Sequence, residues 1–549
     1  MLTADFLHNI RVSLYFTVNV FIRQFLIYVD STRRLSRAMI SLLAPRGLRP
    51  AWIGITAVAA AAVLTLFFLY SPRLQTTTSR VVVPDPVNHI VTDPTYMVDN
   101  STNTDASPVI TDATLIEHLA QYFIDYPIHP PYKERFGELG QRSRVLRDWI
   151  TLADQSADST SKSLLVNATE RVALSLYPFL KSPKGRNAAH KPVGDLRASF
   201  EPGSAGVVIP TSNHTLRFAA HLVGTLRSVL KSTLPIQIIY AGDEDLGPDD
   251  RARLSSTVES GPPLEFLDIL TVFDDSTLQL QTGGWAIKAF AALGSRFERL
   301  ILADADAVFF QPPEVLLEHE AFVRTGALLF HDRLLWQNVF PERNEWYRSQ
   351  IRQPSPALDK SLVWTEDYAE EGDSGLVVLD KSRMDILVAL LHICWQNSYD
   401  VREEVTYKIT YGDKETWWLG LELTGASYEF SGHYGGIVGW DQVDSRGRQK
   451  VCSFVIAHVD AKDRLLWYNG SLLKNKRKSS MKNEYEAPTH WMIDAEWEKG
   501  ARKEDMSCMK GGEARNLTEH EFDIMERSIE LAKILDAMIY PISENTKKA

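Results

Sequence analysis

The chain is poor in cysteine and carries no excess of positive charge, and each shortage excludes a class of protein. Its 549 residues include 3 cysteines, which are too few for a disulfide-rich scaffold but still allow one bridge with one thiol left over. Lysine and arginine together number 59 against 70 acidic residues, so the net charge is −11. Proteins that bind the phosphate backbone are usually basic, so no nucleic acid partner is expected.

Two widespread nucleotide and metal motifs are also missing. The sequence contains neither the P-loop pattern G-x-x-x-x-G-K-S/T nor the zincin pattern H-E-x-x-H, which excludes P-loop kinases and zincin proteases. The composition does not indicate a disordered or fibrous chain, since 44% of the residues are hydrophobic and 23% are charged. Most of the chain is therefore expected to be globular.

An uncharged apolar run, AWIGITAVAAAAVLTLFFLY, occupies residues 51–70 and is long enough to span the roughly 30 Å hydrocarbon core of a membrane as a helix. Arginines cluster at 33–49 and are sparse after the run, so the positive-inside rule places residues 1–50 in the cytoplasm and the rest in the lumen. A second apolar stretch, 12–29, is interrupted by Arg23, which favours an interfacial helix over a second span. The sequence thus predicts a type II membrane protein.

The lumenal part divides by composition. Residues 71–113 are rich in Thr, Ser, Pro and Asp and predict an extended stem, while 114–195 show helical spacing and predict a helical subdomain. The catalytic domain is expected at 196–549. In such a compartment Cys452 and Cys508 can form a disulfide. Five sequons are candidate glycosylation sites: Asn100, Asn167, Asn213, Asn469 and Asn516.

From residue 206 onward, short apolar runs alternate with helical patterns. The runs GVVIPTS, LPIQIIYAG, RLILADADAVFF and GALLF each predict a buried strand, and amphipathic or apolar helices lie between the first three. This alternation predicts an α/β fold with a mostly parallel, Rossmann-like sheet flanked by helices, with ligands at the carboxyl ends of the strands. A last helical pattern, 519–539, places Phe522, Met525, Ile529 and Ile534 on one face and predicts packing on this domain.

Two carboxylates interrupt one of the apolar runs. Asp304 and Asp306 follow RLILA directly and precede AVFF. Charges in such a run are costly unless they are paired or bind a metal. Residues two apart on a strand point to the same side, so the two side chains can share a divalent cation at the strand end. We therefore expect Asp304 and Asp306 to bind a metal and, through it, a phosphate-bearing donor.

Three further polar blocks follow apolar runs. Asp373 and Ser374 stand beside Gly375 just before a strand, where small residues allow a ligand to come close. Asp413, Lys414 and Glu415 precede two tryptophans and predict a helix start that lines the ligand crevice. The third block supplies the residues we expect on the acceptor side: His331, Asp332, Arg333 and Trp336.

Taken in order, the blocks GGWAIKAFAAL, LILADADAVFFQPPEVLL, EEGDSGLVVLDKSR, GDKETWWLGLELTG and HVD resemble the fungal Golgi α-1,3-mannosyltransferase family, glycosyltransferase family 71. The resemblance covers roughly 206–469. It implies a GT-A glycosyltransferase fold, GDP-mannose as the donor, a divalent metal, usually manganese, and retention of the anomeric configuration. It also implies a Golgi membrane location, which agrees with the topology expected from the apolar run.

The resemblance assigns roles to individual residues. His458, in FVIAHVD, corresponds to the histidine that completes the metal site in related enzymes, with Asp460 as the alternative ligand. Lys288 stands where related enzymes present a cation to the donor, and Ser374 contacts the donor sugar. Asp373 is the catalytic candidate, as a nucleophile or as a stabiliser of positive charge. Double displacement and front-face attack both remain open.

The sequence therefore predicts a retaining α-1,3-mannosyltransferase that acts on a mannose hydroxyl of a glycan. Two alternatives remain open. One is a transferase of the same fold that uses another nucleotide sugar, such as a UDP-sugar, since no residue named above reads the base. The other is an inactive, membrane-anchored glycan-binding protein.

Overall fold

The computed structural model describes residues 113–181, 191–258, 260–444, 446–477 and 483–539. The predicted cytoplasmic tail, the anchor at 51–70 and nearly all of the stem lie outside these residues. Among the helices that are described, none is both long and apolar enough to cross a membrane. The described residues belong to one compact unit.

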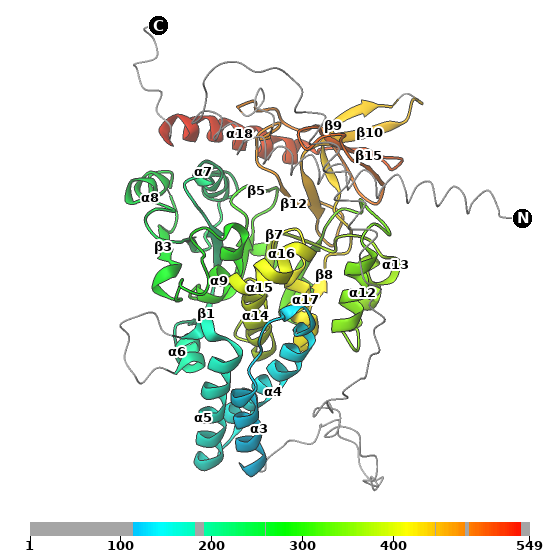
Figure 1. Cartoon of the computed structure of the whole chain (residues 1–549). Coiled ribbons are helices and arrows are strands. Elements are labelled where there is room, and N and C mark those ends of the chain that lie inside the picture. The colour runs from blue at the N-terminus through cyan, green and yellow to red at the C-terminus, as the bar shows by residue number, and fades with distance from the viewer. Residues whose placement is uncertain (1–112, 182–190, 259, 445, 478–482, 540–549) are drawn as a thin grey trace, which may run out of the picture. The chain divides into compact units, whose positions relative to one another are not determined.

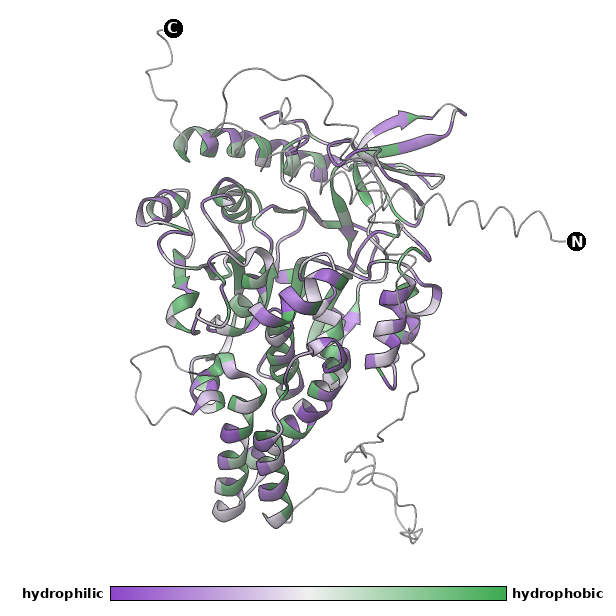
Figure 2. Cartoon of the chain, in the orientation of Figure 1, coloured by the Kyte–Doolittle hydropathy of each residue, from purple (hydrophilic) through white to green (hydrophobic). Residues whose placement is uncertain are grey.

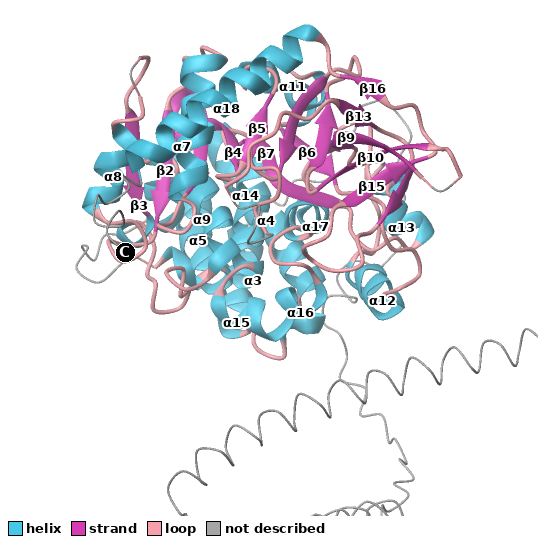
Figure 3. Cartoon of the chain, turned by 90° about the horizontal axis from the view of Figure 1, so that it is seen from above, coloured by secondary structure: helices cyan, strands magenta, loops and turns pink. Residues whose placement is uncertain are grey.

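A seven-stranded sheet forms the centre of this unit, with strand order β3-β2-β1-β4-β7-β6-β8 (Figures 1 and 3). Its strands are β1 (Glu201–Pro210), β2 (Ile236–Tyr240), β3 (Leu264–Asp268), β4 (Phe297–Ala303), β6 (Ala327–His331), β7 (Gly372–Asp380) and β8 (Glu429–Phe430). Strands β3, β2, β1 and β4 are parallel to one another, whereas β7 runs antiparallel to both β4 and β6. The predicted α/β fold is confirmed, with a mixed sheet because β7 is reversed.

Helices cover both faces of this sheet. The evidence is that successive residues of one strand alternate between two buried clusters, each of which contains helices. Leu300 and Leu302 of β4 pack in one cluster with α9, α14 and α17, while Ile301 and Ala303 pack in the other with α7 and α8. Hydrophobic residues gather where these helices face the sheet (Figure 2). The helices are α7 (Leu216–Gly224), α8 (Pro248–Ser255), α9 (Ile287–Gly294), α14 (Met384–Gln396) and α17 (Thr416–Thr424).

The helices predicted within 114–195 are present and share the core of the sheet. They are α3 (Ala113–Asp125), α4 (Phe136–Gln155), α5 (Ser159–Leu176) and α6 (Pro192–Ala198). Helix α4 packs against α14 and α17, and Gly140 of α4 lies so close to Leu423 that a Cβ would meet its backbone oxygen at 2.6 Å. The helical segment therefore packs on the same face of the large sheet as α14 and belongs to the same compact unit.

Two smaller sheets follow along the chain. One has the order β11-β12-β5 and the other β14-β15-β10-β9-β13-β16. Their strands are β5 (Ala307–Phe309), β9 (Ile437–Val443), β10 (Gln449–Ser453), β11 (Ile456–Val459), β12 (Leu465–Asn469), β13 (His490–Met492), β14 (Glu496–Glu498), β15 (Ser507–Lys510) and β16 (Arg515–Asn516). Cys452 of β10 and Cys508 of β15 face each other and form the expected disulfide.

Several short helices connect these strands: α10 (Glu314–Leu317), α11 (Glu320–Thr325), α12 (Pro341–Gln350), α13 (Leu362–Glu366), α15 (Tyr399–Val401) and α16 (Tyr407–Ile409). The last helix, α18 (Glu519–Ile539), packs on α7. Its buried side chains include Met525 and Ile529, as predicted. Ile534 is 58% exposed, so the predicted face was wrong at that position. Nine residues separate Met525 from Ile534, which at 3.6 residues per turn places them on opposite sides of a helix.

Candidate active site

A buried lysine connects the carboxyl end of β4 with the amino end of β7. Lys288, at the start of α9, is 3% exposed, and its ammonium lies 2.9 Å from Asp304 and 3.1 Å from Asp413. It also donates hydrogen bonds to the backbone oxygen and the hydroxyl of Ser374 at 2.6 and 2.9 Å. Four residues predicted to bind the donor thus meet at one point. Burial acts to lower the pKa of Lys288, but the two carboxylates outweigh it and raise that pKa.

The second acid of the D-x-D motif pairs with a lysine that we did not predict. Lys476 makes an ion pair with Asp306, and the backbone N–H of Ser471 donates to the Asp306 backbone oxygen at 2.7 Å. The segment after β12 therefore lies over the motif. Burial, with the neighbouring charge of Arg477, lowers the pKa of Lys476 to about 8 despite the opposing effect of Asp304. The available signal was the basic run KNKRK shortly after an apolar strand.

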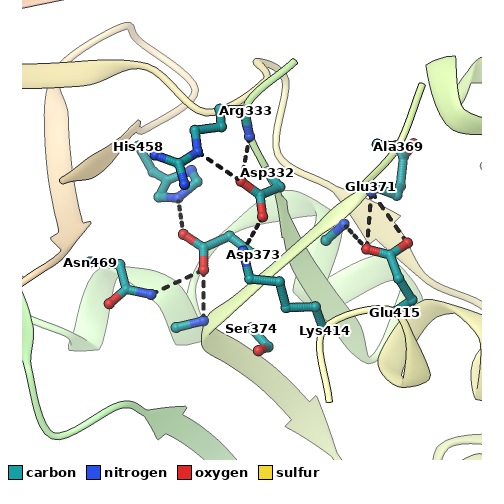
Figure 4. A network of polar contacts seen from close by, with 12 residues as sticks. Asp332, Arg333, Ala369, Glu371, Asp373, Ser374, Lys414, Glu415, His458 and Asn469 are labelled. Atoms are coloured by element: carbon teal, nitrogen blue, oxygen red, sulfur yellow. Dashed lines mark hydrogen bonds and ion pairs between the residues drawn. The ribbon is translucent and has the colours of Figure 1, made fainter. Parts of the chain in front are cut away.

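Asp373, at the start of β7, is held as a fixed charge. One of its oxygens accepts hydrogen bonds from the Gly375 N–H at 3.0 Å and the Asn469 amide at 3.1 Å. The other oxygen lies 3.1 Å from His458 Nε2 (Figure 4). The Asp373 side chain has no exposed surface. Burial acts to raise its pKa, but the hydrogen bond from His458 and the positive charge of Lys414 lower it on balance, so Asp373 is ionised.

The predicted metal ligands are arranged differently from the expectation. His458 contacts Asp373 and stacks on Trp467, with ring centroids 4.4 Å apart. Within the described residues, no three His, Cys, Asp or Glu side chains are grouped to hold a metal ion. The side chains of Asp304 and Asp306 keep 25% and 19% of their surface exposed. Two partly exposed carboxylates suit a hard divalent cation, so these two residues fit a metal better than His458 does. Metal binding itself stays a prediction.

The alternative third ligand is also engaged elsewhere. Asp460 accepts hydrogen bonds from the guanidinium of Arg464 and from the side-chain amide of Gln311. These contacts fix the turn between β11 and β12. The arrangement gives Asp460 a structural role in that turn.

The block around Lys414 contains both a site residue and a structural one. Lys414 makes an ion pair with the buried Asp332 and extends beside Asp373 (Figure 4). Glu415 is fully buried and accepts hydrogen bonds from the backbone N–H of Glu371 and from Trp418 Nε1. Burial raises the pKa of Glu415 to about 8. This carboxyl therefore fixes the backbone at the start of β7. Its buried position does not support the predicted contact with the donor.

Four of the five sequons fall within the described residues, and one of them is built into the site. Asn167, Asn213 and Asn516 are exposed, and Asn100 lies outside the described residues. The Asn469 amide nitrogen donates to Asp373. The same nitrogen is crowded by β7, since a Cβ on Gly375 would lie 2.4 Å from it. Glycosylation of Asn469 stays a prediction, and its contact with Asp373 gives the residue a role in the site.

Residues 204–460 match the family model described as "Mannosyltransferase putative". This segment, slightly less than half of the chain, is similar to that mannosyltransferase family. It holds most of the residues described above, from Lys288 to His458, whereas Asn469 and Lys476 lie beyond it.

Curated relatives extend this match. Alpha-1,3-mannosyltransferase MNT3 of Saccharomyces cerevisiae is 30% identical to this chain over 287 residues, which cover 46% of this chain and 44% of MNT3. Alpha-1,3-mannosyltransferase MNN1 of the same organism is 23% identical over 356 residues, covering 55% of this chain and 44% of MNN1. The chain thus matches less than half the length of these two relatives.

Solved structures give more distant likenesses. The mannosyltransferase Ktr4p from S. cerevisiae is 10% identical, covers 58% of this chain and 84% of its own, and has a TM-score of 0.28. Core-mannan synthase A from Aspergillus fumigatus, in a Mn/GDP form, is 12% identical, covers 46% of this chain and 76% of its own, and has a TM-score of 0.27. Scores of this size do not establish a shared fold.

Proposed function

We propose that this chain is a retaining mannosyltransferase that moves mannose from GDP-mannose to a mannose hydroxyl of a glycan in α-1,3 linkage. The observation that carries the proposal is the meeting of Lys288 with Asp304, Asp413 and Ser374 at the carboxyl end of β4, next to the ionised Asp373. The match of residues 204–460 to a mannosyltransferase family model supports the sugar. The similarity to MNT3 and MNN1, both named alpha-1,3-mannosyltransferases, supports the linkage.

Breaking the bond between mannose and a nucleoside diphosphate leaves negative charge on the departing phosphate. Fixed positive groups next to that charge stabilise the transition state more than the ground state. Lys288 and Lys476 are the cations at this edge of the sheet, one beside each acid of the D-x-D motif. Asp304 and Asp306 are the residues that would hold manganese, which when bound supplies further positive charge to the phosphates.

Positive charge develops at the anomeric carbon in the same step, and Asp373 is the carboxylate placed to stabilise it. Both of its oxygens accept hydrogen bonds or face His458, and its side chain is fully buried. A carboxylate held in this way acts through its charge without having to move. The arrangement favours electrostatic stabilisation by Asp373 over direct attack.

The proposal includes a Golgi location with the catalytic part in the lumen. The orientation rests on the sequence of residues 33–70, which contains the arginine cluster and the apolar run. Protease treatment of sealed microsomes tests the orientation. A protected C-terminal part supports it, and digestion of that part in intact vesicles contradicts it.

The donor is tested by incubating the full chain, in detergent, with manganese and a panel of nucleotide sugars while nucleoside diphosphate release is measured. We expect release from GDP-mannose, and loss of release when a chelator removes the metal. Release from a UDP-sugar alone would favour the transferase with another donor. Failure to turn over any donor would favour the glycan-binding alternative.

The role of the acidic pair is tested by Asp306→Asn, which keeps the size of the side chain and removes its charge. We expect mannose transfer to fall about a hundredfold to a thousandfold, the usual loss for one electrostatic contact to a transition state. Manganese binding, followed by electron paramagnetic resonance, should weaken as well. The exposed Asp249→Asn is the matched control and should change neither reading. Transfer within threefold of the parent in Asp306→Asn would exclude Asp306 from the site.

A further inference from the structure

Two chain segments run antiparallel beside the site and bring an unassigned acid next to the predicted acceptor residues. The Asp332 N–H donates to the Glu371 backbone oxygen at 2.7 Å, and the Asn338 N–H donates to the Asp367 oxygen at 2.9 Å. Between these bonds, 337 and 368 form an antiparallel bridge. The pairing places Glu370 across from 333–336. Glu370 also lies three residues before Asp373 on the same segment.

Glu370 is half-buried and has a free carboxylate. Within the described ranges it has no hydrogen-bond or ion-pair partner, in contrast to Glu371, whose carboxylate bonds to Ser361 and Tyr434. The charged groups near Glu370 include Asp332, Lys414, Arg343, Arg333, Lys499 and Glu415. Burial and the nearby Asp332 raise its pKa. A polar group left unpaired at a half-buried position has unused capacity to bind a ligand.

Donors and an apolar surface stand across from this acid. Arg333 Nε makes no hydrogen bond to any described residue, and the Asp332 carboxylate lies 3.9 Å away from it. Trp336 is 37% exposed, and the ammonium of Lys499 lies 5.9 Å from the centre of its ring. The edge of the site therefore offers an acceptor, a donor and an exposed aromatic face within one antiparallel pair of segments.

The charges at this edge indicate what kind of ligand it takes. Asp332, Glu370 and Asp373 stand close to Lys414, Arg333, Arg343 and Lys499, so opposite charges largely cancel and a strongly anionic ligand gains little net attraction. A neutral polyhydroxyl compound matches better, because its hydroxyls both donate and accept while the C–H face of its ring packs on an indole. Lys414 connects the acceptor edge with the catalytic candidate, since it pairs with Asp332 and extends beside Asp373 (Figure 4).

We propose that Glu370, Arg333 and Trp336 form the subsite for the acceptor sugar. Glu370 accepts hydrogen bonds from hydroxyls of a neutral hexopyranoside, Arg333 donates to it, and Trp336 packs on its ring. The occupant rests on the proposed function, because a mannosyltransferase must place an acceptor hydroxyl beside the reacting carbon. The subsite adds Glu370 as an acceptor-binding residue.

The test compares acceptor kinetics of the full chain with those of Glu370→Gln and Trp336→Ala, using methyl α-mannoside and mannobiose as acceptors. We expect each variant to raise the acceptor KM about tenfold or more, the effect of losing a hydrogen bond to a charged group or a packed ring. The KM for the donor, and hydrolysis of the donor without acceptor, should stay unchanged. Exposed neighbours supply the matched controls Glu366→Gln and Val339→Ala, which should leave all constants unchanged.

Direct binding separates failure of this subsite from failure of the proposed function. Methyl α-mannoside binding is followed by saturation-transfer nuclear magnetic resonance, and thermal melts show whether each variant is folded. If the parent turns over no donor but binds the sugar, and both variants lose that binding, the subsite stands and the transferase activity fails. If the folded variants keep the parent's acceptor KM or sugar binding, or if the parent binds no sugar, the subsite is wrong.

Discussion

At the scale of single residues, the site is a set of buried charges that depend on one another. Lys288 is placed between Asp304 and Asp413, and it is the cation that pairs with both carboxylates. Removing one partner of a buried ion pair is far more costly than removing both, because the remaining charge has lost its solvation. The stability of this region and its chemistry therefore depend on the same lysine.

This dependence gives a prediction for Lys288→Met. The variant leaves two carboxylates close together without their cation, and we expect it to lose about 3–5 kcal/mol of unfolding free energy. The double variant Lys288→Met/Asp413→Asn should recover part of this loss, because one of the uncompensated charges is gone. Urea denaturation of the parent, the two single variants and the double variant measures the coupling. Additive losses would contradict the ion-pair network.

The sequence identified many of these residues for a physical reason. Asp304, Asp306, Asp373 and Lys414 stand next to apolar runs, where a charge is costly without a role. Lys476 could not be predicted as a site residue, because it lies in a polar, basic run that is typical of exposed surface. The contact of Asn469 with Asp373 was not predictable, because a three-residue sequon carries no information about burial.

At the scale of elements, the contact between β7 and the end of β12 holds the catalytic candidate in place. A Cβ on Gly375 would lie 2.4 Å from the amide nitrogen of Asn469, which is the group that donates to Asp373. The close approach of these two strands therefore requires glycine at this position.

Gly375→Ala should push the Asn469 side chain away from Asp373. We expect a stability loss of about 1–3 kcal/mol, the cost of leaving a buried charged group without one of its hydrogen bonds. Adding Asn469→Ala to this variant should cost little more, because the same bond is already broken. Gly432→Ala is the control, since nothing lies within 4 Å of a Cβ there. Thermal and urea melts measure the effect, and an unchanged Gly375→Ala would show that the contact is unimportant.

Most strands of the large sheet could be predicted, because a short apolar run bounded by turn residues indicates a buried strand. β1, β2, β4 and β6 each contain a run that was read as a strand. The reversed direction of β7 was not predictable, because a run buried on both faces reads the same in either orientation. The pairing of 331–338 with 367–372 also depends on contacts that no local pattern encodes.

At the scale of the whole molecule, residues 431–436 join the large sheet to the two smaller sheets. The Ser431 N–H donates to Leu329 of β6, and the Gly435 N–H donates to the Asp332 oxygen. Gly436 pairs with Ala457 of β11, next to His458. Hydropathy predicts a membrane span from sequence, but a junction of this kind is long-range and leaves no periodic signal.

His433 stands within this junction and connects two distant turns. Its Nδ1 lies 2.8 Å from Asp494 and its Nε2 lies 3.0 Å from Asp463, so both ring nitrogens face carboxylates. Both nitrogens carry protons only in the imidazolium form. Partial burial acts to lower the pKa of His433, but hydrogen bonds and charge from Asp494 and Asp463 outweigh it and raise that pKa. The protonated form therefore holds the two turns together.

The pH dependence of stability follows from this shift. A histidine whose pKa is higher in the folded state contributes its full stabilisation below the unfolded value of about 6.5, and loses it as pH rises through the folded value. The parent should therefore melt at a higher temperature than His433→Gln below about pH 6.5. The two melting curves should converge as the pH rises above the folded pKa. The junction also holds Asp332 through the Gly435 N–H. Loss of the His433 charge should loosen this contact, so the acceptor KM of His433→Gln should increase over the same acidic range.

A matched control is His118→Gln, because His118 is an exposed histidine on α3, a helix that packs against α5 in the N-terminal part of the unit. Its melting temperature should follow that of the parent at every pH. A constant difference between parent and His433→Gln across the whole pH range would mean that the side chain contributes through packing alone. In that case the charged pairs with Asp463 and Asp494 would have no measurable role, and the junction would depend on the backbone bonds of Gly435 and Gly436.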